Sequence, residues 1–283
     1  MNDQRRGILL VLGAALLWSS AGVGIKAIDD GPLKVAFFRS AIAAIALFAI
    51  VRPPRPRITP MFVTAIVSYA ACLTTFVVAT KWTSAANAIF LQYSGVVWVL
   101  LLAPVLLKEP MRGRDAVAIG VSLCGMTLLF VGQLGGGMLA GNLMAVLSSI
   151  FFALLVIALR KESGGRAETA VTWGNVLATV AIFPFIIRDL HVTPRSAAVL
   201  VFLGVFQIAL AYVLFVRGLR HVTATQASLT AMLEPVANPI WVFLFLGERP
   251  ASFAVVGGAI VLGAIAWRAV NVGPPEPEIQ ATS

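Results

Sequence analysis

A single carboxylate lies near the middle of an apolar stretch in the last third of the chain. Residues 222–250 are enough to cross a bilayer, yet they contain Glu234, followed at once by Pro235 and then by Pro239. An ionisable group at the centre of a hydrophobic span costs at least ~3 kcal/mol, so it normally faces protein or water. Carbonyls freed by the prolines must be satisfied there too. We expect Glu234 to be functional; the alternative is a structural carboxylate that ties helices together.

Helical spacing places further polar side chains on the same broad stripe as Glu234. They are Gln226, Thr230, Asn238 and the aromatic Trp241. Carboxylate and amide oxygens accept hydrogen bonds from an ammonium group. We therefore expect Glu234 to bind an ammonium group, with help from Asn238 and Gln226 and from the freed carbonyls, and we include Thr230 in the substrate site.

Residues 84–98 form a second apolar stretch with polar and aromatic groups at membrane depth, namely Asn87, Gln92, Tyr93, Ser94 and Trp98. A carrier for a zwitterion with an apolar side chain needs partners for an ammonium and a carboxylate, and a surface for the remainder. The carboxylate candidates are Ser19, Ser20, Asn87 and Tyr93, with Arg39 as a more remote option. The candidates for an apolar cavity wall are Trp18, Phe90, Tyr93, Trp98, Tyr212 and Trp241.

Arg39 has a second interpretation, which we favour at this stage. It lies about 9 Å inside the outer end of its span, at ~1.5 Å rise per residue. A long basic side chain at that depth can snorkel to the interface or pair within an outer gate. We therefore expect Arg39 to be a gating or interface residue.

The composition identifies an integral membrane protein. Of 283 residues, 59% are apolar and 12% charged, with a mean hydropathy of +0.94, whereas about a quarter of the residues in soluble domains are charged. The net charge of +9 does not indicate nucleic-acid binding, because the basic residues form short clusters between apolar runs. Cys72 and Cys124 lie in apolar segments without metal-ligand spacing, so we expect neither a disulfide framework nor a metal site. The first apolar run is longer than a signal-peptide core and predicts a membrane helix.

Taking about twenty apolar residues per crossing, the sequence predicts an all-helical protein with ten transmembrane helices. The approximate limits are 7–28, 33–51, 59–80, 84–107, 114–132, 138–159, 168–187, 195–217, 223–246 and 251–269. If the N-terminus is cytoplasmic, fourteen Lys and Arg residues lie on that side and seven on the other. This bias predicts that both termini are cytoplasmic.

An internal repeat divides the chain into two halves. At an offset of 139 residues, 79–88 matches 218–227 and Glu109 matches Glu248; at an offset of 134, 7–26 matches 141–160. Because each half has five spans, an odd number, the second half must be inverted relative to the first. Inverted repeats are typical of transporters with a midplane site. We expect five-helix repeats at 1–132 and 138–269 and a disordered cytoplasmic tail at 270–283. Only the second half carries the acid, since Gly95 stands where Glu234 stands.

Four segments carry a resemblance to the drug/metabolite transporter (DMT) superfamily, EamA type. They are residues 81–88, 224–228, 233–236 and 245–250, which read KWTSAANA, ATQAS, LEPV and FLGERP. The resemblance covers nearly the whole chain and implies a ten-helix inner-membrane carrier that moves amino acids, sugars or other metabolites, commonly outward. In length and aromatic content the chain is most similar to the aromatic amino acid exporters. It departs from the pattern at 93–95, which read YSG, and at 108–110, which read KEP where a Gly-Glu pair is usual, so equal gating roles for the halves are left open.

The predicted function is export of neutral or aromatic amino acids by alternating access, with Glu234 as a possible proton carrier and facilitated diffusion as the simpler account. We expect a monomer in the bacterial inner membrane that binds a small molecule and the lipid bilayer, with no nucleic acid, cofactor or metal. An exporter of organic cations or drugs is the main alternative. A channel is harder to exclude than an intramembrane enzyme, for which no His-Glu-x-x-His or Gly-x-Ser-x-Gly occurs, or an ATP-driven pump, for which no phosphate-binding loop occurs.

Overall fold

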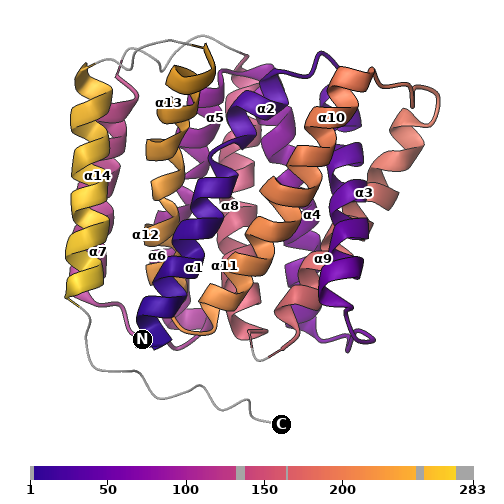
Figure 1. Cartoon of the computed structure of the whole chain (residues 1–283). Coiled ribbons are helices and arrows are strands. Elements are labelled where there is room, and N and C mark those ends of the chain that lie inside the picture. Colours follow the sequence, from indigo (N-terminus) through magenta and orange to yellow (C-terminus); the bar gives the residue numbers. More distant parts are fainter. Residues whose placement is uncertain (1–2, 132–137, 164, 247–251, 272–283) are drawn as a thin grey trace.

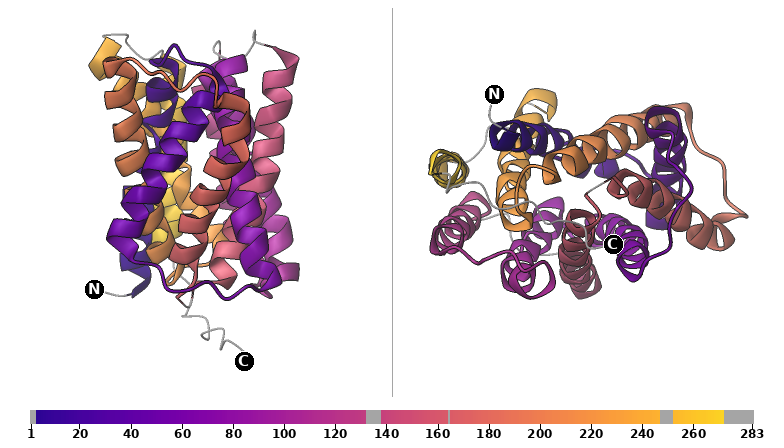
Figure 2. Two further views of the ribbon diagram at one scale, coloured as in Figure 1. Left: turned by 90° about the vertical axis from the view of Figure 1, so that its right-hand side faces the viewer. Right: turned by 90° about the horizontal axis from the view of Figure 1, so that it is seen from below.

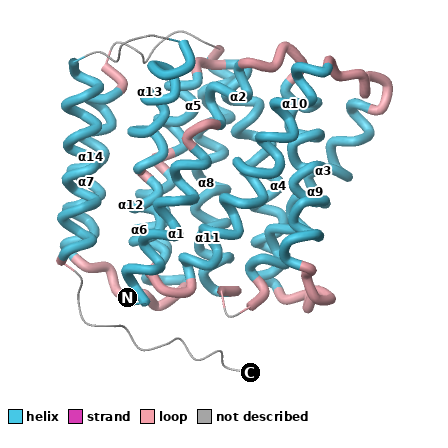
Figure 3. Tube along the Cα trace, viewed as in Figure 1, coloured by secondary structure: helices cyan, strands magenta, loops and turns pink. Residues whose placement is uncertain are grey.

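Helices make up the whole of the regular structure in the described part of the chain. The computed structural model describes residues 3–131, 138–163, 165–246 and 252–271, and these contain no strand (Figure 3). The elements are α1 (Asp3–Trp18), α2 (Ala21–Lys26), α3 (Pro32–Val51), α4 (Pro60–Trp82), α5 (Ala85–Gln92), α6 (Gly95–Leu106), α7 (Gly113–Leu129), α8 (Leu139–Lys161), α9 (Ala167–Ile186), α10 (Pro194–Phe202), the π-helix η1 (Leu203–Leu210), α11 (Ala211–Leu219), α12 (Ala224–Ala231), α13 (Leu233–Leu246) and α14 (Ser252–Val270).

These elements fill the ten predicted spans. Eight described segments are long and apolar enough to cross a membrane. The other two spans are α7, which has 17 residues, and the consecutive helices α12 and α13. The predicted all-helical membrane fold is therefore confirmed. Of the predicted tail at 270–283, the structure describes only Val270, the last residue of α14, and Asn271.

Three spans are broken near their middle. The first is interrupted at Ser19–Ser20 between α1 and α2, the fourth at Tyr93–Ser94 between α5 and α6, and the ninth at Met232 between α12 and α13. The last two breaks coincide at the repeat offset, because 93 plus 139 is 232. Pro235 explains the break at Met232. It has no N–H to donate to the carbonyl of Ala231, four residues earlier, and proline is tolerated in the first turn of α13, where N–H groups have no intrahelical acceptor.

The two halves of the bundle run in opposite directions (Figure 1). α1 begins at the lower face of the molecule in this view, whereas α8, its counterpart, begins at the upper face. Equivalent contacts occur at both faces: a Cβ on Gly7 would lie 2.7 Å from His221 Cβ, and one on Gly141 would lie 2.7 Å from the carbonyl carbon of Trp82. In each half, the start of the first helix therefore packs against the turn that precedes the broken span of the other half.

Helix packing follows the same pseudo-symmetry. α4 packs on α8 as α11 packs on α1, while α3 pairs with α9 and α7 with α14. α7 and α14 stand together at one edge of the bundle (Figures 1 and 2), in such close contact that a Cβ on Gly257 would overlap the backbone nitrogen of Leu129. α14 ends at the lower face, where α1 begins, so both lead to the same side of the molecule.

Candidate functional site

The breaks in the fourth and ninth spans meet inside the bundle. The hydroxyl of Tyr93, at the first break, lies 2.7 Å from the carbonyl oxygen of Ala231 and 2.7 Å from Oε2 of Glu234, at the second break. Ala231 is the residue whose carbonyl Pro235 leaves free, so Tyr93 supplies the donor that the helix lacks. Tyr93 and Glu234 are only 3% and 7% exposed. The predicted functional acid is therefore held by the other half of the molecule.

The position of Glu234 in α13 also stabilises negative charge. It is the second residue of the 14-residue helix, where unpaired backbone N–H groups and the helix dipole favour an anion. Its counterpart Gly95 has no room for a side chain, because a Cβ there would lie 2.8 Å from the carbonyl oxygen of Ser149 on α8. Close packing of α6 on α8 thus explains why only one half carries the acid.

The break in the first span lies against α13 beyond Glu234. The indole Nε1 of Trp241 donates to Ser19 Oγ at 2.6 Å, and Ser19 Oγ in turn donates to the carbonyl oxygen of Leu16. A Cβ on Gly22 would lie 3.3 Å from Nδ2 of Asn238. Asn238 is buried, and its Oδ1 has no hydrogen-bond partner among the described residues. Ser19 therefore lies against the part of α13 that carries Trp241, and Asn238, one turn after Glu234, faces α2.

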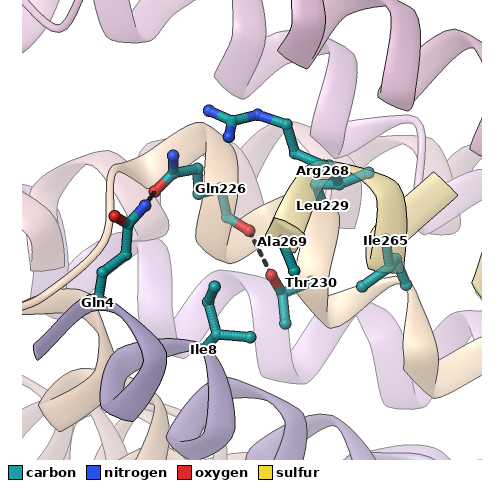
Figure 4. A pocket seen from close by; sticks show the side chains of 8 residues that line it. All are labelled: Gln4, Ile8, Gln226, Leu229, Thr230, Ile265, Arg268 and Ala269. Carbon is teal, nitrogen blue, oxygen red and sulfur yellow. Dashed lines mark hydrogen bonds between the residues drawn. The ribbon is translucent and has the colours of Figure 1, made fainter. Parts of the chain in front are cut away.

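Gln226 and Thr230 lie on the part of α12 that leads from the lower face toward Glu234. Gln226 forms a capping box with Thr223, and its Oε1 accepts from Nε2 of Gln4 on α1 at 3.3 Å. Thr230 donates to the carbonyl oxygen of Gln226. Both line a pocket between α1, α12 and α14 (Figure 4), whose lining residues are Gln4, Ile8, Gln226, Leu229, Thr230, Ile265, Arg268 and Ala269.

Asn87 and Trp98 do not join this group. The amide of Asn87 donates to Thr83 Oγ1 at 3.0 Å and lies near Asn142 Oδ1, so it ties the start of α5 to α8 near the upper face. Trp98 is 42% exposed. The expectation that it lines an internal cavity is wrong, because its side of α6 lies on the surface of the bundle. Every face of this helix is apolar, so the sequence gives no sign of which face is buried.

Arg39 does not snorkel, which corrects the interpretation favoured from the sequence. Only 1% of its surface is exposed, and Nε, Nη1 and Nη2 are all buried without a hydrogen-bond partner among the described residues. Sequence reasoning failed here because depth along one helix does not reveal whether the neighbouring helices cover that face.

A group of aromatic side chains joins α1, α4 and α11, and the sequence analysis predicted two of its members, Trp18 and Tyr212. The ring of Tyr212 lies 5.0 Å from that of Trp18 and 4.7 Å from that of Tyr69, and Tyr69 Oη accepts from Asn175 Nδ2 at 2.8 Å. Tyr69, Asn175 and Gln207 of η1 were not predicted. The signal that singled out Glu234, a polar group in the middle of an apolar span, would have found all three.

The lower face is held by buried acids, each paired with an arginine. Glu109, after α6, lies 2.7 Å from Arg160 Nε and accepts from the backbone nitrogen of Ala224, the first residue of α12. This contact joins the two halves. Other pairs at this face are Glu162 with Arg166, Glu168 with Arg220, and Asp115 with Arg268. Among the described residues no group of three or more His, Cys, Asp or Glu could hold a metal ion.

A bundle of two inverted halves, with facing helix breaks and a carboxylate between them, is the architecture of a secondary membrane transporter. The chain belongs to the EamA-like transporter family, which matches residues 5–131 and 139–268. The family resemblance inferred from the sequence is thereby confirmed, and the two matched segments correspond to the two halves.

Several relatives are named as transporters or exporters. The chain is 26% identical to an uncharacterized transporter of Archaeoglobus fulgidus, covering 93% of this chain and 97% of the relative. It is 24% identical to the pseudopaline exporter CntI of Pseudomonas aeruginosa, covering 91% and 94%. It is 25% identical to a probable terminal-alkyne amino-acid exporter of Streptantibioticus cattleyicolor, covering 86% and 84%.

A solved crystal structure has the same fold. It superimposes with a TM-score of 0.80 and covers 95% of this chain and 100% of the other, at 19% sequence identity. At this identity the likeness concerns the fold alone. The family, the fold and the named relatives together identify a multi-pass membrane transporter of the DMT type.

Proposed function

We propose that this transporter exports small metabolites with an amino group, in particular neutral or aromatic amino acids, across a bacterial inner membrane. The observation that carries the proposal is the buried Glu234, which Tyr93 of the other half holds at 2.7 Å where two helix breaks meet. A carboxylate removed from water binds an ammonium group strongly, and nearby aromatic rings accommodate an apolar side chain. Two relatives are named as exporters, one of them for an amino acid.

The proposed mechanism is alternating access with a monomer as the working unit. The halves 1–132 and 138–269 rock against one another about the contact between Tyr93 and Glu234, which opens the interior to one side and then to the other. Both termini are assigned to the cytoplasm because basic residues are concentrated at the lower face. The role is transport rather than catalysis, and a gradient drives it.

Hydrogen-bond geometry supports Glu234 as the proton carrier in this cycle. The hydroxyl of Tyr93 has one proton, but it has two oxygen neighbours at 2.7 Å. The carbonyl of Ala231 can only accept, so both contacts are fully satisfied when Glu234 carries a proton and donates to Tyr93. An incoming ammonium group would displace that proton, and transport would then be an exchange of substrate for a proton.

Export of lipophilic organic cations is the second candidate function. It is favoured by the same carboxylate and by the tilted aromatic contacts of Trp18 with Tyr212 and Phe215, since aromatic faces attract cations. Competition between amino acids and lipophilic cations for the same site would separate the two functions.

The experiment is counterflow of labelled L-phenylalanine in proteoliposomes, with and without a pH gradient, for the wild type and Glu234→Gln. We expect saturable counterflow that the gradient accelerates in the wild type. We expect Glu234→Gln to lose at least about tenfold in L-phenylalanine affinity because it lacks the charge-assisted contact, and to lose the response to the gradient.

Each part of the proposal can fail separately. If Glu234→Gln and the wild type exchange L-phenylalanine equally well in both conditions, Glu234 neither binds the ammonium group nor carries a proton. If the wild type shows counterflow of tetraphenylphosphonium but of no amino acid, the cation function replaces the first proposal. Non-saturable flux would identify a channel.

A further inference from the structure

One buried arginine has no hydrogen-bond partner among the described residues, although the lower face shows how this chain pairs its buried charges. Glu109, Glu162, Glu168 and Asp115 each have an arginine at the lower face. Arg39 has none: its three guanidinium nitrogens are buried and without a hydrogen-bond partner among the described residues. A guanidinium carries five N–H donors and stays charged in proteins, so burying it unpaired is strongly unfavourable. Structural packing alone gives no reason for a cation at this position.

Helices that pack on α3 or on η1 carry other buried polar atoms without a hydrogen-bond partner among the described residues. α3 packs on α9 and on η1, and these carry Asn175 Oδ1 and Gln207 Oε1, which are buried and without a partner among the described residues. α1, which also contacts η1, contributes the unpaired Nε1 of Trp18. Polar groups left unpaired in a buried region of a native protein call for a specific explanation, such as a ligand.

The π-helix η1 shapes this region. A Cβ on Gly204 would lie 2.6 Å from Ile42 Cγ2 and 3.1 Å from the carbonyl oxygen of Arg39, so η1 approaches α3 closely at the arginine. π-helical turns are rare and occur frequently at functional sites. The wider turn changes which residues of the span face inward, and it places the buried Gln207 within η1.

We propose that Arg39 is the carboxylate-binding residue of the substrate site, and that the substrates are therefore amphoteric molecules rather than simple cations. This inference rests on the proposed function and specifies its substrate class. The guanidinium binds the carboxylate through two parallel hydrogen bonds, while Glu234 binds the ammonium group of the same molecule. Arg39 and Glu234 are both buried, at 1% and 7% exposure, so the proposed site has a positive charge at one end and a negative charge at the other.

A site of this kind selects by charge as well as by shape. An amino acid neutralises both buried groups at once. A lipophilic cation neutralises only Glu234 and leaves Arg39 unpaired beside a second positive charge, so it is rejected through an unfavourable interaction.

Three ligands that share a phenylethyl group test the assignment. L-Phenylalanine carries both charges, phenethylamine lacks the carboxylate, and 3-phenylpropionate lacks the ammonium group. Binding to the purified full-length protein is measured by thermal stabilisation and by inhibition of L-phenylalanine counterflow. For the wild type we expect L-phenylalanine to bind at least about tenfold more tightly than either single-charge ligand, as one lost charged hydrogen-bond pair implies.

The two charge variants should have opposite effects on the single-charge ligands. Arg39→Gln should weaken the binding of L-phenylalanine and 3-phenylpropionate and leave the binding of phenethylamine unchanged or tighter. Glu234→Gln should weaken the binding of L-phenylalanine and phenethylamine. Lys34→Gln is the matched control, because Lys34 is a cation of the same helix whose charge is already paired with Asp30 and Asp189. This control should leave the order of the three binding affinities unchanged.

The outcomes separate this inference from the proposed function. If Arg39→Gln weakens all three ligands equally, Arg39 is only structural and the inference is overturned while an amino-acid exporter remains. If the wild type prefers phenethylamine or binds none of the three, both proposals fail. If it binds 3-phenylpropionate through Arg39 but not L-phenylalanine, the carboxylate subsite stands and the amino-acid function does not. Should Arg39→Gln not fold, Arg39→Lys, which keeps the charge but not the planar fork, must lower the preference of L-phenylalanine over phenethylamine.

Discussion

The hydroxyl of Tyr93 compensates for a hydrogen bond that Pro235 cannot make. It reaches the carbonyl of Ala231 and the carboxyl of Glu234 from the other half of the molecule. Pro235, next to the acid, leaves the carbonyl of Ala231 without its intrahelical donor. A residue far away in the sequence supplies that donor instead. The acid and its support therefore come from different repeats.

Tyr93→Phe tests this dependence at the residue scale. The variant keeps the ring but leaves a buried carbonyl and a buried carboxyl without a donor, which should cost about 1–3 kcal/mol of stability. We expect a lower thermal unfolding temperature in detergent and slower L-phenylalanine counterflow.

Thr127→Val is the control for that substitution, because the Thr127 hydroxyl donates only to the carbonyl of Leu123 within α7 and is exposed. Its effect should stay within ~0.5 kcal/mol. Equal unfolding temperatures for the two variants would mean that Tyr93 does not support the helix break.

At the scale of elements, the two halves are joined by helix starts that fit closely against turns. Gly7 of α1 packs on the turn after α11, and Gly141 of α8 packs on the turn after α4. These positions correspond at the repeat offset of 134 residues. Glycine thus allows the same close approach of helix and turn at both faces of the bundle.

Gly141→Ala should separate α8 from the end of α4. The added Cβ would lie 2.7 Å from the carbonyl carbon of Trp82 and 2.8 Å from the nitrogen of Thr83, both backbone atoms that cannot move aside alone. We expect a loss of about 1–3 kcal/mol of stability, measured by thermal unfolding, and a similar loss for Gly7→Ala. Gly120→Ala is the control, since nothing lies within 4 Å of its Cβ. If the Gly141 and Gly120 variants unfold at the same temperature, the close contact does not hold the halves together.

The sequence predicts the spans well because their limits depend on local features. Apolar length and boundary residues such as Pro32, Pro60 and Pro194, each at the start of a helix, are visible without any neighbour. The break at Ser19–Ser20 and the π-helix η1 were not predicted, because both depend on which helix packs alongside. Gly204 illustrates this: its lack of a side chain has meaning only once α3 is known to lie against it.

The site was predictable to the extent that one rule applies, namely that a polar group at membrane depth needs a partner. That rule found Glu234 and Tyr93 but not their contact, because a hydrogen bond between residues 141 positions apart leaves no mark on local sequence. It also could not decide for Arg39 between the surface and the interior. The choice depends on whether α9 and η1 cover that face of α3, which is a property of the assembled bundle.

At the scale of the whole molecule, the lower face is closed by contacts between the halves. Glu109 of the first half binds Arg160 and the first backbone N–H of α12, both in the second half. Arg160 also donates to the carbonyl of Leu219 at the end of α11. In the proposed rocking motion, opening this face breaks these contacts, and we therefore expect the Glu109 cluster to act as a latch for one access state.

Glu109→Gln should therefore favour the state that is open at the lower face. Loss of a charged hydrogen-bond partner is worth about 1.5–3 kcal/mol, which shifts an equilibrium by roughly tenfold or more. The measurement is the rate at which a membrane-impermeant maleimide labels Thr230→Cys, next to Gln226 in the lower pocket, in a Cys124→Ser background; Cys72 is buried. We expect faster labelling in Glu109→Gln, from the cytoplasmic side.

Glu168→Gln provides the matched control, because Glu168 is also a buried acid of the lower face, but its partner Arg220 belongs to the same half. Removing a pair within one half does not change the balance between access states, so the labelling rate should stay constant. Arg57→Cys and Arg112→Cys mark the lower face and should both label from the cytoplasmic side. Labelling of these two positions from opposite sides would overturn the topology, whereas equal acceleration by Glu109→Gln and Glu168→Gln would show that the Glu109 contacts stabilise the fold without controlling access.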